Sequence, residues 1–138
     1  MHDKSDIWER SKECAAQAEK VVQERNSRSI ANGGHGVDDW SDHYSLKFNR
    51  CYVKFDFFVV VKEPPKGIPL TMSYLLDAFE RSNIAVYSDG IRPEVACRSE
   101  NDAEACERRA LPWWTCTVQE KTVACEDAKR FMDEHMKN

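Results

Sequence analysis

The sequence lacks an apolar run long enough to cross a bilayer. The longest run, Phe57 to Val61, is far shorter than the roughly 20 residues that a membrane-spanning helix needs. An excess of positive charge is also missing, since 20 basic and 24 acidic residues are interspersed and give a formal net charge of −4. No basic patch stands out that would attract a polyanion. We therefore expect no transmembrane segment and no nucleic-acid partner.

Sequence signatures of catalysis are missing as well. No G-x-S-x-G nucleophile elbow occurs, and the glycine-rich stretch over 32–36 lacks the Lys-Ser/Thr pair of a phosphate-binding loop. No two cysteines have the CxxC spacing that is typical of redox-active pairs. We therefore expect a protein without catalytic activity and without a cofactor.

Six cysteines in 138 residues stand out against these absences. Disulfides persist in oxidising compartments and are rare in the cytosol, so this content favours a periplasmic or secreted protein. The first residues, Met1 to Asp6, are polar and contain no apolar signal-peptide core. We expect that a leader was removed and that Met1 was added for expression.

The pattern of the chain predicts a single α+β domain over residues 1–138. An antiparallel β-sheet meander should pack against N- and C-terminal helices, because the connections are too short for helical crossovers between parallel strands. The expected elements are a helix over 5–25, strands over 51–61, 70–79, 84–92 and 113–119, a disulfide-closed loop over 94–109 and a helix over 123–137.

Alternation of apolar residues makes the strand over 51–61 the clearest element. Cys51, Val53 and Phe55 begin a row of apolar side chains that shares one face. Residues 70–79 also alternate, although their helix-forming residues leave a helix open as an alternative. Both segments are therefore expected in the sheet.

The strand over 84–92 should contain a tight turn. Asp89-Gly90 is a favoured type I′ dipeptide and would return the chain through Ile91. Pro93 would place the returning strand at a sheet edge. The charged residues of 94–109 then favour a loop outside the core.

Helical spacing marks both ends of the chain. Cys14, Ala18 and Val21 lie on one stripe of the first helix, and Ala128 and Met132 repeat the pattern in the last. The sheet should therefore pack on an apolar side of each helix.

The facing of the cysteines restricts the disulfide pattern. The expected bonds are Cys14–Cys51, Cys97–Cys106 and Cys116–Cys125. The first joins the apolar stripe of a helix to the core row of a strand, the second closes the charged loop, and the third brackets the turn into the last helix. A mixed pairing among the last four cysteines stays open. A zinc site is a weaker alternative, because the last four cysteines are not closely spaced in pairs.

The segment from His35 to Tyr44 holds two imidazoles and three carboxylates. Such groups can bind a divalent metal or supply an acid–base pair, so a small hydrolase or metal-dependent enzyme centred on His35, Asp39, Asp42 and His43 is an alternative function. The simpler interpretation is a solvated loop without a metal, in which aspartate and serine cap the next turn. His43 is the residue to test first, because it adjoins aromatic residues.

Two tryptophans are adjacent in the expected strand over 113–119. Successive side chains of a strand point to opposite faces, so either Trp113 or Trp114 should point away from the core. An outward tryptophan marks a contact surface. This pair therefore favours a protein partner.

Residues 14–18 read Cys-Ala-Ala-Gln-Ala, and residues 43–51 read His-Tyr-Ser-Leu-Lys-Phe-Asn-Arg-Cys. Together they resemble small exported bacterial proteins of unknown activity, which carry a helical Cys-Ala-x-Gln-Ala and a strand-opening His-Tyr-Asn-x-x-Leu-Asn-Lys-Cys. This chain departs from that pattern at Ser45, Phe48 and Arg50. The resemblance implies an exported, disulfide-bearing protein and assigns no catalytic residue.

The same resemblance draws attention to His43, Tyr44 and Asn49 as a local structural unit. Asn49 is expected to hydrogen-bond the turn that leads into Cys51, with Tyr44 and Phe48 packed beneath it. These residues, with Asp42 and His35, are the candidate site.

Together the features indicate an exported, non-enzymatic protein that binds another protein or associates with the cell envelope. The disulfide-held sheet or the segment 94–109 would present the binding surface. A secreted enzyme inhibitor has the same features and is a further alternative.

Overall fold

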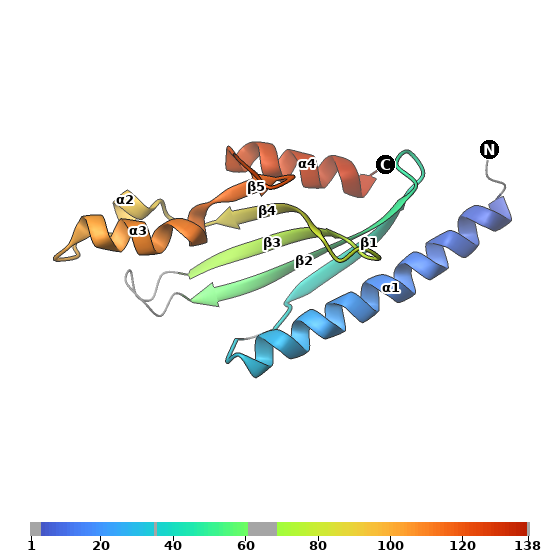
Figure 1. Cartoon of the computed structure of the whole chain (residues 1–138), viewed down its shortest axis with the longest axis horizontal. Coiled ribbons are helices and arrows are strands. Elements are labelled where there is room, and N and C mark those ends of the chain that lie inside the picture. The colour runs from blue at the N-terminus through green and yellow to red at the C-terminus, as the bar shows by residue number, and fades with distance from the viewer. Residues whose placement is uncertain (1–3, 35, 61–68, 138) are drawn as a thin grey trace.

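The computed structural model describes residues 4–34, 36–60 and 69–137, whose arrangement is drawn in Figure 1. The described chain forms one antiparallel sheet of six strands together with helices. In chain order the elements are α1 (Lys4–Ala31), β1 (Asp39–Ser45), β2 (Arg50–Val60), β3 (Pro69–Asp77), β4 (Asn83–Asp89), α2 (Pro93–Ala96), α3 (Ala103–Trp114), β5 (Cys116–Val118), β6 (Lys121–Val123) and α4 (Cys125–Lys137).

The sheet is a meander in which the strands lie in sequence order from β1 to β6, each antiparallel to the next. The long β2 and β3 lie inside the sheet, while the polar β1 and the short β6 form its edges. This arrangement confirms the expected α+β fold, with a helix at each end of the chain.

One face of the sheet packs against α1. Cys14, Ala18 and Val21 recur at helical spacing and contact the alternating row that includes Val53 and Phe55 on β2. All five side chains are buried. Because removal of apolar surface from water drives folding, this contact is a main part of the core.

The opposite face packs against α4. Met132 lies in a cluster with Tyr52, Leu75 and Ala85, which come from β2, β3 and β4. Burial raises the pKa of the Tyr52 hydroxyl, because the ionised phenolate would lose its hydration. Along residues 4–34, 36–60 and 69–137, no helix is both long and apolar enough to span a membrane.

All three expected disulfides are present: Cys14–Cys51, Cys97–Cys106 and Cys116–Cys125. The first attaches α1 to the start of β2, as the facing of the two cysteines predicted. The other two each close a sequence separation of 9 residues. The single-domain organisation over 1–138 stays a prediction.

The solvated loop expected before Tyr44 is wrong in part, because Asp39–Ser45 forms β1. Each of its residues pairs with one of β2, and Asp42 lies opposite Val53. An edge strand pairs with a neighbour on one side only and needs little apolar alternation. The polar sequence of β1 therefore gave no sign of a strand.

The loop expected over 94–109 is wrong in part: the Cys97–Cys106 bond closes it and residues 97–102 form turns, but the rest of the segment belongs to α2 and the first half of α3. Asp102 caps α3, since its side chain accepts the backbone N–H of Ala105 at 3.0 Å. The alanine, glutamate and arginine residues that follow have high helix propensity. Their charge is therefore the exposed side of a helix and not a sign of a loop.

The strand expected over 84–92 ends at Asp89, and no type I′ turn follows it. Gly90 has no positive φ, and a Cβ there would lie 2.9 Å from Nε1 of Trp114. The absence of a side chain at Gly90 therefore lets Trp114 pack closely against the backbone. Pro93 is the first residue of α2 and does not begin a returning strand.

The strand expected over 113–119 is shorter, because Trp113 and Trp114 form the end of α3 and β5 begins at Cys116. A turn at Gln119 and Glu120, both with positive φ, leads into β6, which the sequence did not predict. The first helix runs to Ala31, beyond the expected end at 25. Val61 of the expected strand over 51–61 lies outside the described residues.

Candidate functional site

A groove of about 560 Å³ opens at the end of the sheet where the β1–β2 and β3–β4 turns meet the first third of α1. We call it the turn-end groove. Its lining residues are Arg10, Glu13, Tyr44, Phe48, Asn49, Arg50, Cys51, Asp77, Phe79 and Glu80. Concave sites of about 300–1,000 Å³ are typical of ligand binding.

A hydrogen-bond network joins α1 to the β1–β2 turn. Nη1 of Arg10 donates to Oη of Tyr44 at 3.1 Å and to Oδ1 of Asn49 at 2.6 Å, and the Tyr44 hydroxyl donates to the same Asn49 oxygen. The bond to Tyr44 is the main reason that the pKa of Arg10 is raised. Asn49 has a φ of 51°, a left-handed conformation that asparagine adopts more readily than most residues. The network fixes one wall of the turn-end groove.

The other wall is organised by the buried Asp77 carboxylate. Its Oδ1 accepts the backbone N–H groups of Phe79 and Glu80 at 2.9 and 3.0 Å, and its Oδ2 accepts Nη1 of Arg50 at 3.0 Å. The hydrogen bond from Arg50 to Asp77 raises the pKa of the Arg50 guanidinium. One carboxylate therefore caps the β3–β4 turn and attaches β2 to it.

Two aromatic side chains border these charged groups. Phe79 is 56% exposed, and Phe48 is 40% exposed although its ring stacks on His135 of α4 at 4.8 Å. Exposed aromatic residues beside arginine are a composition that protein interfaces favour. The turn-end groove therefore combines apolar edges with charged groups of both signs, an arrangement suited to binding.

The structure places only part of the predicted site in the turn-end groove. Tyr44 and Asn49 line it, whereas Asp42 and His43 do not. Successive residues of β1 point to opposite faces: His43 lies opposite Tyr52, and Asp42 lies opposite a residue that packs against α1. The strand therefore separates Asp42 from His43.

The remaining members of the predicted site give no cluster. Asp39 is four residues from His43 along β1, and His35 lies outside the described residues. Within the described segments, no group of three or more His, Cys, Asp or Glu side chains could hold a metal ion. The described members of the predicted site therefore form no metal-binding group.

Tyr44 and Asn49 were correctly grouped, but their contacts differ from those expected. Asn49 bonds to the Arg10 side chain and not to the turn, while Phe48 packs on α4. Sequence reasoning missed Arg10 and Asp77. An Asp at the end of a strand is a known turn signal and could have identified Asp77, whereas Arg10 is 39 residues from Asn49 and carries no local signal.

Replacing Asp77 with alanine should lower the free energy of unfolding by about 2 kcal/mol, because two turn N–H groups and Arg50 lose a shared acceptor. The loss should be limited because Arg50 is partly exposed and can be hydrated. Asp77→Asn is the matched control, since its amide oxygen can still accept the turn N–H groups. Urea denaturation measures the loss of stability in each variant, and amide exchange at Phe79 reports whether its N–H is still hydrogen-bonded. Equal losses in the two variants would contradict this role of Asp77.

Comparison with known proteins adds no assignment to this geometry: no family model matches the chain, and neither does any curated protein or solved structure.

Proposed function

We propose that this chain is an exported, non-enzymatic protein-binding module of the periplasm or the extracellular space. Its three disulfides favour an oxidising compartment, since such bonds are rare in the cytosol. The resemblance of residues 14–18 and 43–51 to exported bacterial proteins supports the same location. These segments meet in the fold, because Cys14 bonds to Cys51.

The observation that carries the proposal is the turn-end groove. Its walls are held by the Cys14–Cys51 bond, by the hydrogen bonds of Asn49 and by those of Asp77. A site whose walls are already ordered loses less conformational entropy when it binds. Exposed Phe48 and Phe79 supply apolar contact area in the same groove as the charged groups. These are properties of a binding surface, and no catalytic step is needed to explain them.

The charges of the turn-end groove indicate what enters it. Three carboxylates, those of Glu13, Asp77 and Glu80, line it against the two guanidinium groups of Arg10 and Arg50. Asp77 and Glu80 share Arg50, while Glu13 has no ion pair among the described residues. A cationic side chain next to an aromatic or aliphatic one would complement this surface. The proposed ligand is therefore a protein segment that presents such a pair.

Site-specific photo-crosslinking tests the proposal. A photo-crosslinking amino acid in place of Phe79 should capture a protein chain in an extract from the native source, and mass spectrometry should identify the crosslinked peptide. Ile30, near the end of α1 and also 56% exposed, is the matched control position. Capture of the same chain at both positions, or capture of none at position 79, would refute a binding role of the groove.

A further inference from the structure

The residues from Pro93 to Trp114 form an arm at the end of the molecule opposite the turn-end groove. Figure 1 shows α2 and α3 beyond one end of the sheet, whereas the start of α1 and the two turns lie at the other end. The Cys97–Cys106 bond joins the two helices, and both cysteines are fully buried. Disulfide closure gives this small excursion a defined shape without the support of a large core.

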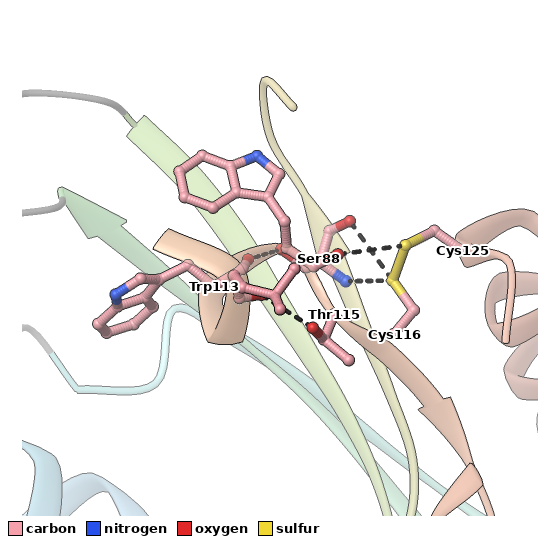
Figure 2. Close-up of a disulfide and its surroundings, with 7 residues drawn as sticks. Ser88, Trp113, Thr115, Cys116 and Cys125 are labelled. Carbon is pink, nitrogen blue, oxygen red and sulfur yellow. Dashed lines mark hydrogen bonds between the residues drawn. A yellow bond between two sulfur atoms is a disulfide. The ribbon is translucent and has the colours of Figure 1, made fainter. Parts of the chain in front are cut away.

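The arm is attached firmly at its base. The hydroxyl of Ser88 on β4 donates to the backbone oxygen of Trp113, and the backbone N–H of Ser88 lies 3.2 Å from Sγ of Cys116. Figure 2 shows these contacts around the Cys116–Cys125 disulfide, which continues into α4. Trp114 also packs on Leu70 of β3. The direction of the arm is therefore fixed by the sheet.

Near this base, α3 carries an exposed cation next to an exposed ring. Arg109 and Trp113 are four residues apart and hence neighbours on one side of α3. Trp113 is 38% exposed, and Arg109 has no ion pair among the described residues. Trp and Arg are the residues that most often dominate binding energy at protein interfaces. The sequence predicted that one tryptophan would point outward, and Trp113 does so. It lies on a helix, however, and not on the expected strand.

The pair matches the surface of the turn-end groove. Glu13 and Glu80 offer carboxylates to a guanidinium, and Phe48 and Phe79 offer rings to an indole. The arm and the groove lie at opposite ends of the molecule, so the arm of one copy cannot reach its own groove. We propose that the arm of one copy docks in the turn-end groove of a second copy, through Arg109 and Trp113.

This inference rests on the proposed function and names the partner of the same groove. Contact between an arm and a groove uses two different surfaces, so the association is head-to-tail. After the first contact, one copy still has an unused groove and the other still has an unused arm, so further copies can add. The assembly should therefore grow with protein concentration.

Sedimentation velocity on the purified, non-reduced protein tests the inference. The wild-type chain should sediment as a concentration-dependent series of oligomers. An arm variant, Arg109→Glu with Trp113→Ser, and a groove variant, Glu13→Lys with Glu80→Lys, should each bind about 30-fold more weakly or worse, as for interface hot spots. Arg108→Glu with Leu111→Ser makes the same types of change elsewhere on α3 and should associate like the wild type.

Mixing the arm variant with the groove variant gives the sharpest result. The arm variant keeps an intact groove and the groove variant an intact arm, so the mixture should form dimers and nothing larger. A wild-type chain that stays monomeric at every concentration would overturn the inference, as would an arm variant that associates normally. Denaturation curves like that of the wild type establish that the variants are folded.

Crosslinking from position 79 separates this inference from the proposed function. A crosslinked peptide from α3 of a second copy supports both. A peptide from a different protein keeps the proposed function and overturns self-association, while the absence of any captured chain overturns both.

Discussion

Replacing Cys14 and Cys51 together with alanine is expected to lower the free energy of unfolding by about 4 kcal/mol, as the loop-entropy relation gives for a sequence separation of 37. The bond restricts the unfolded chain and also attaches α1 to β2 where both side chains are buried. A loss of this size is a large part of the stability of a typical domain, about 5–15 kcal/mol. Urea denaturation of the non-reduced protein measures it.

The bond between Cys97 and Cys106 provides the matched comparison. Its sequence separation is 9, so the same relation predicts a loss about 1 kcal/mol smaller when both residues become alanine. Its removal should also act mainly on the arm, because α3 makes few contacts with the sheet beyond Trp114. If the variant that lacks the Cys97–Cys106 bond were less stable than the one that lacks Cys14–Cys51, loop length would not be the dominant factor in how much each disulfide stabilises the fold.

The Cys14–Cys51 bond was predictable because two independent periodicities agreed. The stripe of Cys14, Ala18 and Val21 has the spacing of a helix, and the row from Cys51 through Val53 has the spacing of a strand. Each pattern indicates which side of its element is buried. Cys14 and Cys51 lie on these buried sides, so they were expected to come together where the helix packs on the strand. The inner strand β2, the two helices that cover the sheet and the Cys14–Cys51 bond could therefore be inferred from local patterns.

The candidate site was only partly predictable, because it is made by contacts distant in sequence. Tyr44 and Asn49 are five residues apart and could be grouped, while Arg10 reaches Asn49 only after α1 has packed on the sheet. The polar β1 gave no apolar alternation, since pairing with β2 decides its structure. The helices of the arm were mistaken for a loop because the segment is rich in charged residues, although Asp102 carried the N-cap signal of α3.

Phe55→Ala should be the most damaging single core substitution among the aromatic residues of β2, with a loss of about 3–5 kcal/mol. Its side chain is 0% exposed, lies between α1 and the sheet, and stacks on Tyr74 with ring centroids 5.6 Å apart. The surrounding helix is bonded to β2 through Cys14 and cannot fully collapse into the space. Phe58→Ala, on the opposite face and 44% exposed, is the matched control and should cost far less.

Tyr74 supplies a second readout that separates a hydrated cavity from simple loss of contacts. Burial raises the pKa of its hydroxyl, because the phenolate is poorly solvated there. Water admitted by Phe55→Ala would solvate the phenolate and move the pKa of Tyr74 back down toward the usual value of about 10. Alkaline titration followed by NMR of the tyrosine ring carbons would detect the shift. An unchanged pKa together with a large loss of stability would mean that the space stays dry, and a loss no larger than that of Phe58→Ala would mean that α1 closes over it.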